Sequence, residues 1–395
     1  MRFVSRLHLC AAASILMVLY LTWMLHSTSF ETSVSGFWKA SKHRIVVFGD
    51  DWSDTGTYRT SSPSQSAAAS RDVDRGEIWV ETLCQKLGCD RIDNFARSRL
   101  ANIENSDFGP VVDMNVHELA KHGESIGNTT TFFDFKTQVR QFLSYNKSPA
   151  NIAQRLSRVD ERITFTVFFG LWDILEYAKL EIQPAMSAIE YSIAQLFSCL
   201  DTLAEKTATP VRVVIPSMID VTFLPWFQSF KLDTQEHFAE LQHQVVFLRA
   251  YWNTLLREAA SEWKNGVVFM PDPNMIIVEQ VRISQLFARK ISDASGVGQQ
   301  APLFEEVNEP CLVLQQDVRM TDMQAAVVEK CADPTQYLFW DDVRLGGSAH
   351  HLIGEQAARL IRGNRTANER AMQGSTKHQN SKEQEGGSFN LSLLD

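Results

Sequence analysis

The 395-residue chain is predicted to fold as an α/β protein, in which helices cover both faces of a mostly parallel β-sheet to give three layers. Two observations predict this class. Short apolar segments alternate with longer segments of helical periodicity through the body of the chain, a pattern typical of parallel sheets. A hydrophobic content of 44% in a chain of this length is also sufficient to form a large core.

Each predicted element is a separate segment of this alternating pattern. The predicted strands are residues 44–48, 91–94, 164–169, 211–215 and 267–270. The predicted helices are residues 77–87, 133–145, 186–206, 235–263 and 348–362. The helix from residue 235 carries an apolar stripe at helical spacing, and we expect this stripe to pack in the core or under a lid.

The N-terminal segment is predicted to be a transmembrane helix. Arg2 and Arg6 precede an apolar run over residues 9–25, which is close to the minimum length for a membrane span. Positive charge before the span predicts a cytosolic N-terminus, and therefore a type II signal anchor with a luminal or extracellular body. The alternative is a cleaved signal peptide and a secreted protein, because small residues at 27–29 offer a cleavage site.

The rest of the chain divides into three predicted parts. After a cytosolic stub and anchor over residues 1–30, residues 31–42 form a short stem. Residues 43–363 are expected to form one domain. The tail over residues 364–395 is expected to be disordered, because its residues 365–388 are polar and bury too little surface to offset their ordering entropy.

A motif follows the first predicted strand. Residues 48–56 read Phe-Gly-Asp-Asp-Trp-Ser-Asp-Thr-Gly. They resemble the opening block of the GDSL (SGNH) family of ester hydrolases, whose usual form is F-G-D-S-L-S-D-x-G. In that family the residue after the first Asp is the serine nucleophile. Asp51 occupies this position here.

Three later segments resemble the remaining family blocks, in the same order along the chain. In the second block, after Asn-Phe-Ala, Arg99 stands where a glycine usually gives a backbone donor to the oxyanion hole. In the third block Gly170 and Asp173 are kept, and Trp172 replaces the asparagine of that hole. The fourth block, D-x-x-H in the family, keeps Asp341 and has Arg344 in place of the histidine base.

The resemblance implies the three-layer SGNH-hydrolase (flavodoxin-like) fold, in a fungal-like member with degenerate catalytic blocks. Serine esterolysis needs a hydroxyl nucleophile, a base and preorganised oxyanion donors. Asp51 brings negative charge to the nucleophile position, and Arg344 stays protonated at physiological pH, so it cannot act as a base. We therefore expect a catalytically impaired protein that is retained for binding a ligand, such as an acyl ester or glycan, or a partner.

Two other functions remain open from the sequence. One is an active ester hydrolase with a rearranged site, which would act on acylated glycans or lipids and would need a displaced base such as His350 or His351. The other is a purely structural or partner-binding protein whose cleft is closed. An open apolar patch elsewhere on the surface would favour this last function.

The triad positions are predicted to have become an ion pair. Asp51 and Arg344 replace residues that touch in the family, and Asp341 is the expected second partner of Arg344. The remaining residues expected to line the cleft are Asp50, Ser53, Asp54, Arg99, Gly170, Trp172 and Asp173. The positive charge of Arg344 among these aspartates argues against a bound Mg²⁺ or Ca²⁺. No metal or other cofactor is expected.

Cysteines and sequons agree with a body outside the cytosol. In an oxidising compartment we expect the disulfides Cys84–Cys89 and Cys311–Cys331, with Cys199 reduced and buried. Glycosylation sequons occur at Asn128, Asn146, Asn364 and Asn390. The net charge of −9 gives no reason to expect nucleic acid as a partner.

Overall fold

The computed structural model describes residues 43–55, 73–98, 109–117, 134–147, 162–207, 211–229, 235–314 and 328–363. The contacts of the chain divide it into two compact units. The first unit comprises Met1–Lys42 and Arg158–Arg162, and the second comprises His43–Ser157 and Ile163–Asp395. Of the first unit only Arg162 is described, so the fold below is that of the second unit.

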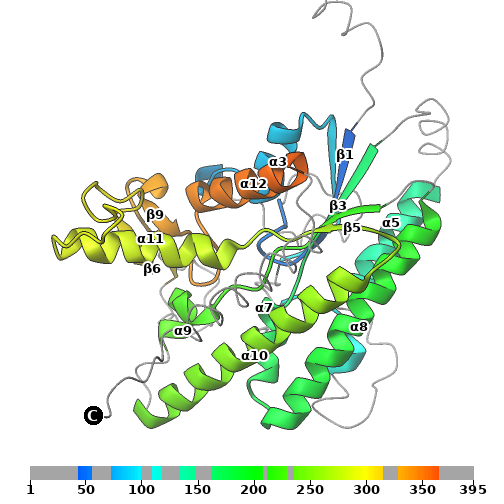
Figure 1. Ribbon diagram of the computed structural model, residues 1–395, viewed down its shortest axis with the longest axis horizontal. Helices are drawn as coiled ribbons and strands as arrows, with labels where there is room; N and C mark the ends of the chain where they lie inside the picture. Colours follow the sequence, from blue (N-terminus) through cyan, green and yellow to red (C-terminus); the bar gives the residue numbers. More distant parts are fainter. Residues whose placement is uncertain are drawn as a thin grey trace, which may run out of the picture. The chain divides into compact units, whose positions relative to one another are not determined.

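A five-stranded sheet forms the centre of this unit, as predicted (Figure 1). Its strands are β1 (His43–Gly49), β2 (Arg91–Asn94), β3 (Arg162–Phe168), β4 (Val211–Val214) and β5 (Gly266–Phe269). Their order in the sheet is β2-β1-β3-β4-β5. The pairs β1–β2, β3–β4 and β4–β5 are parallel. This is the strand order of doubly wound, flavodoxin-like sheets.

Strand β1 lies inside the sheet because its sequence is apolar on both faces. Its residues Ile45, Val46, Val47 and Phe48 are fully buried. A continuous run of β-branched and aromatic residues is typical of a parallel strand that is covered on both sides. Phe48 packs in an aromatic cluster whose ring centroids lie 5.5–6.2 Å apart.

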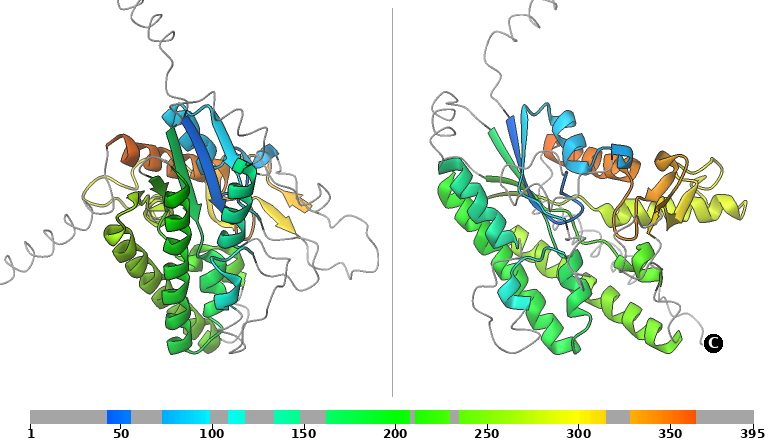
Figure 2. Two further views of the ribbon diagram at one scale, coloured as in Figure 1. Left: turned by 90° about the vertical axis from the view of Figure 1, so that its right-hand side faces the viewer. Right: turned by 180° about the vertical axis from the view of Figure 1, so that it is seen from behind.

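Helices cover both faces of the sheet, as the views from the side and from behind show (Figure 2). On one face α3 (Trp79–Leu87) lies beside α12 (Gly347–Arg362). These two helices approach closely because α12 carries Gly354 at the contact, where a Cβ atom would lie 2.6 Å from the carbonyl oxygen of Trp79. The helices of the other face are α5 (Phe135–Lys147), α8 (Ile182–Lys206) and α10 (Gln235–Glu262).

All five predicted strands and all five predicted helices are present, with ends displaced by at most four residues. Several further elements were not predicted. They are the helices α7 (Leu171–Tyr177), α9 (Pro225–Ser229) and α11 (Pro273–Ala288), the pair β6 (Glu306–Pro310) and β9 (Tyr337–Phe339), and the pair β7 (Leu312–Leu314) and β8 (Val328–Lys330). The start signal of α11 is present in the sequence, since Asp272 caps the helix and Pro273 is its first residue.

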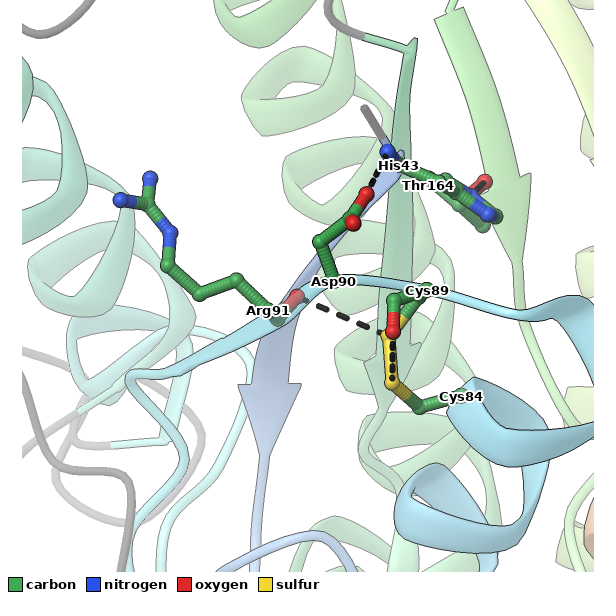
Figure 3. The surroundings of a disulfide bond; sticks show 6 residues. All are labelled: His43, Cys84, Cys89, Asp90, Arg91 and Thr164. Carbon is green, nitrogen blue, oxygen red and sulfur yellow. Dashed lines mark hydrogen bonds between the residues drawn. A yellow bond between two sulfur atoms is a disulfide. The ribbon is translucent and has the colours of Figure 1, made fainter. Parts of the chain in front are cut away.

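Both predicted disulfides are confirmed. Cys84 and Cys89 join the end of α3 to the approach of β2, with their Cα atoms 4.9 Å apart (Figure 3). The Cα atoms of Cys311 and Cys331 lie 4.8 Å apart, next to the β7–β8 pair. Cys199 is free and buried on α8, and burial raises the pKa of its thiol to about 12.

Several predicted features lie outside the described residues: the apolar segment 9–25, the stem 31–42, the tail 364–395, and the sequons at Asn128, Asn364 and Asn390. No helix within the described ranges is long and apolar enough to cross a membrane. Asn146 is described and lies on α5, where its side-chain oxygen accepts hydrogen bonds of 3.3 Å from both terminal nitrogens of Arg44.

Candidate functional site

The candidate site lies where the carboxyl ends of β1 and β3 meet. Asp50 and Asp51 directly follow β1, and Gly170, Trp172 and Asp173 follow β3. The backbone N–H of Asp50 donates to the carbonyl oxygen of Phe168 at 3.3 Å, which fixes the two strand ends side by side. The chain runs outward in opposite directions from β1 and β3, and open α/β sheets bind their ligands at such a point.

Asp51 is buried and bonded to the indole of Trp172. The Nε1–H of Trp172 donates to Oδ2 of Asp51 at 2.9 Å. Both side chains are at most 2% exposed. The indole ring lies directly on the backbone of Gly109, where a Cβ atom would be only 2.0 Å from Nε1 of Trp172. Trp172 therefore directs its only polar hydrogen at Asp51.

Arg344 pairs with Asp341. The Nε–H of Arg344 donates to Oδ2 of Asp341 at 2.6 Å, and Nη2 lies 2.5 Å from the same oxygen. The backbone N–H groups of Val343 and Arg344 donate to Oδ1 of Asp341 at 3.1 and 2.7 Å. Burial alone would raise the pKa of Asp341, but the charge and hydrogen bonds of Arg344 outweigh burial and lower it.

Asp51 acts on Arg344 through its charge. Burial acts to lower the pKa of Arg344, but nearby negative charges raise it overall. The charge and hydrogen bond of Asp341 contribute most to this increase, and the charges of Asp51 and Asp342 contribute less. The hydrogen bond and ion pair that the structure describes for the Arg344 side chain are with Asp341. The structure thus brings the three predicted residues into one electrostatic group, in which the direct contact is Arg344–Asp341.

Asp50 and Asp173 form a second, buried acidic pair beside this group. Burial raises the pKa of Asp50, and the charges of Asp51 and Asp173 raise it further. Burial also raises the pKa of Asp173 to about 7. Oδ1 of Asp173 accepts from the backbone N–H of Val112 at 3.2 Å, whereas its buried Oδ2 has no hydrogen-bond partner among the described residues.

Three further residues expected to line the cleft have structural partners. Ser53 is fully buried, and its hydroxyl oxygen accepts from the indole of Trp79 at 3.3 Å. Oδ2 of Asp54 accepts from the backbone N–H and hydroxyl of Ser98 at 2.9 and 3.0 Å. Gly170 has φ = 120° and begins α7, and a side chain there would meet the ring of Trp252 at 2.9 Å.

Arg99 lies outside the described residues, so its predicted position in the cleft is not described. Within the described ranges, no cluster of three or more His, Cys, Asp or Glu side chains could hold a metal ion.

The histidines considered as displaced bases are placed differently from each other. His350 is fully buried, and its Nε2 lies 2.9 Å from Nη2 of Arg75. Because a guanidinium can only donate, Nε2 of His350 accepts this bond and is occupied. His351 is half-exposed on α12 and pairs with Glu355 at 3.3 Å. Neither arrangement resembles a base that is hydrogen-bonded to a hydroxyl nucleophile.

Two contributors to the site were missed from the sequence, Arg75 and Gly109. Arg75 ends a short 3₁₀ helix (Val73–Arg75), contacts His350 and helps to lower the pKa of Asp341. Gly109 gives Trp172 the space it needs. Both residues lie far from the family blocks in sequence, so no local pattern indicated them.

Comparison with known proteins gave structural matches alone. No family model matches the chain, and no curated protein matches it in sequence. An inhibitor-bound aryl esterase from M. smegmatis matches with 15% identity and a TM-score of 0.36, over 81% of this chain and 99% of that chain. A carbohydrate acetylesterase family member from Sinorhizobium meliloti matches with 12% identity and a TM-score of 0.35, over 81% and 97% of the two chains.

Replacing Arg344 by alanine is expected to lower the free energy of unfolding by about 2–3 kcal/mol, because buried Asp341 loses its charged partner. The effect is placed below the range of about 3–5 kcal/mol for fully buried pairs because the Arg344 side chain is 26% exposed. Arg282→Ala is the matched control, since it breaks the exposed pair with Asp293 and should cost much less than Arg344→Ala. Urea unfolding measures both, and equal losses would contradict the assignment.

Proposed function

We propose that this chain is a catalytically impaired member of the GDSL (SGNH) type, retained for binding a ligand or partner. The proposal rests on the four sequence blocks and on one structural observation. Asp51, in the nucleophile position, is buried and accepts a hydrogen bond from Trp172, in the oxyanion position. The two groups that would have to act on a substrate are thereby bonded to each other.

Each requirement of serine esterolysis supports the proposal separately. The nucleophile position carries a carboxylate whose charge opposes a developing oxyanion. The base position carries Arg344, which is paired with Asp341 and cannot accept a proton. The neighbouring hydroxyl of Ser53 is buried against Trp79 and accepts its indole hydrogen. Activation of a hydroxyl nucleophile requires an adjacent base.

The ligand class and compartment follow from the resemblance and from the N-terminal sequence. An acyl ester or a glycan is the ligand class that the family implies. The apolar segment over residues 9–25 favours a membrane-anchored protein with its domain in the lumen or outside the cell, with secretion as the alternative.

The test is an ester-hydrolysis assay of the full-length chain with p-nitrophenyl acetate, p-nitrophenyl butyrate and acetylated xylan. We expect rates equal to the buffer blank. The variant Asp51→Ser/Arg344→His is expected to stay inactive because Trp172 still fills the oxyanion position, and adding Trp172→Asn is expected to give the first measurable turnover. Turnover by the natural chain that survives Asp51→Ala and is lost on His350→Ala or His351→Ala would overturn the proposal.

A further inference from the structure

An open groove is lined by helices of the second unit. It has a volume of about 1150 Å³ and is lined by the segment from α7 to the start of α8, by α9, and by the first half of α10. Figure 1 shows α7, α9 and α10 next to one another. Small-molecule pockets usually have volumes of about 300–1,000 Å³. The size of this groove therefore fits a peptide segment better than a small ligand.

The lining of the groove is largely apolar. Leu175, Ala178 and Phe227 are among the lining residues and are at most 6% exposed. Ile182 and Phe247 also line the groove and remain 38% and 40% exposed. Exposed apolar surface gathered in a groove is typical of an interaction site.

The polar rim of the groove carries both signs of charge. Lys179, His237 and His243 lie on it together with Glu181 and Glu240. Lys179 is already paired with Glu176, and the side chain of Gln244 donates to the carbonyl oxygen of Leu180 at 2.6 Å. Apart from the two histidines, these residues carry one positive and two negative charges, so we expect apolar contact and not charge to select the occupant.

The C-terminal end of the chain has the matching composition. Residues 364–388 contain one large apolar residue, Met372, whereas residues 389–395 read Phe-Asn-Leu-Ser-Leu-Leu-Asp. In an extended segment alternate side chains point to opposite sides. Phe389, Leu391 and Leu393 would then share one side, and Asn390 and Ser392 the other.

The end of the chain can reach the groove. The described part ends with α12 and Gly363. Residues 364–388 can extend to about 80 Å at roughly 3.3 Å per residue. A compact domain of roughly 320 residues has a radius of gyration of only about 20 Å. Length therefore imposes no restriction on where the last seven residues bind.

We propose that residues 389–395 bind in the groove between α7, α9 and α10, with Phe389, Leu391 and Leu393 facing its apolar lining. The chain thus carries its own occupant for this apolar groove. This inference goes beyond the proposed function and does not depend on it, because it uses neither the Asp51 group nor any step of ester chemistry.

The test uses full-length chain in lipid nanodiscs and a variant that stops after Ser388. A fluorescein-labelled peptide of residues 389–395 is titrated into both, with anisotropy as the signal. We expect the shortened chain to bind the peptide at least tenfold more tightly than the intact chain, in which the groove is already occupied. Equal binding to both chains, or no binding to the shortened one, would overturn the proposal.

Matched variants locate the contact on both partners. A peptide with Phe389→Ser, Leu391→Ser and Leu393→Ser should bind at least tenfold more weakly, whereas Asn390→Ala with Ser392→Ala should change binding less than twofold. On the protein, Ile182→Glu and Phe247→Glu should abolish binding. Tyr191→Glu, which changes an exposed α8 residue outside the groove, should leave binding intact.

Other occupants give distinct outcomes in the same experiment. If phosphatidylcholine vesicles bind the shortened chain through Phe247 while the peptide does not bind, the groove takes lipid and the proposal is wrong. Light scattering of the intact chain identifies which copy supplies the segment. Once the peptide binds the shortened chain as expected, a dimer that Phe389→Ser separates would place the segment in the groove of a second copy, and a monomer would place it in its own groove.

Discussion

Replacing Trp172 by alanine is expected to lower the free energy of unfolding by about 5 kcal/mol, the largest effect of any single substitution at the site. Truncating a buried tryptophan usually costs about 3–5 kcal/mol through lost burial and the cavity that remains. Asp51, which is buried, also loses the indole donor at 2.9 Å, and hydrogen bonds to charged groups contribute about 1.5–3 kcal/mol. The cost of truncating the side chain and the cost of losing the hydrogen bond are not fully additive. The estimate is therefore lower than the sum of the two upper values.

Trp172→Phe separates the hydrogen bond from the packing. Phenylalanine keeps most of the apolar contact and removes the indole N–H, so the expected loss is about 2 kcal/mol. Trp263→Phe is the matched control, because Trp263 donates to Asp201 at 2.7 Å in a half-buried position, and it should cost about 1 kcal/mol or less. Guanidinium unfolding of the three variants measures these differences. A Trp172→Phe variant as stable as the control would show that the bond to Asp51 does not hold this site together.

The sheet could be predicted because its strands are short apolar segments with clear ends. Strand β1 is fully buried along Ile45–Phe48, and the residues that follow it, Gly49 and Asp50, end the apolar run. The helices could be predicted for a similar reason, since α10 follows its apolar spacing through Val245, Leu248 and Trp252, all buried. Helix α7 was missed because all seven of its residues are buried, which leaves no alternation of polar and apolar faces to detect.

The family blocks grouped Asp51, Trp172, Asp341 and Arg344 from the sequence, but they did not give the contacts among these residues. Asp51 and Trp172 follow β1 and β3 of the predicted sheet, whereas Asp341 and Arg344 follow β9, which was not predicted. The choice of partner within the group depends on side-chain geometry. The guanidinium of Arg344 contacts the carboxylate of Asp341, three residues earlier in the chain. Two backbone N–H groups also donate to this carboxylate and fix its position. A pattern of residue types contains no information about that choice.

The buried acid pair could not be predicted, because it depends on what excludes water. Asp173 is fully buried, and its Oδ2 lacks a partner among the described residues. The sequence shows only an aspartate at the start of a short helix, where a solvated carboxylate is equally common. Burial, and not a neighbouring residue type, sets the pKa of this group.

Asp173→Asn is expected to make the protein more stable above neutral pH and to flatten the dependence of its stability on pH. In the unfolded chain the pKa of an aspartate is about 3.9, whereas burial raises the pKa of Asp173 to about 7 in the folded protein. The folded state therefore binds the proton more tightly. The stabilisation from this proton is complete below about pH 4 and is lost as pH rises through about 7.

A difference of about three pKa units corresponds to roughly 4 kcal/mol, so the natural chain should lose several kcal/mol between about pH 5 and pH 8. Asparagine has no charge to bury and keeps an oxygen for the N–H of Val112. At pH 5 we expect the variant to lie within about 1 kcal/mol of the natural chain, and at pH 8 to exceed it by about 2–4 kcal/mol.

Two other acids affect how the pH dependence of stability is interpreted. Asp341 has a lowered pKa, so its contribution is present above about pH 4 and lost only in stronger acid, outside the measured window. The pKa of Asp50 is raised by burial, and then by Asp51 and Asp173, so removing the charge of Asp173 also relieves Asp50. Urea unfolding at several pH values between 5 and 8 measures the difference, with Asp293→Asn on the exposed surface as control. Parallel curves for the natural chain and Asp173→Asn would mean that this carboxyl is ionised and solvated throughout, and that the acid pair is not closed to water.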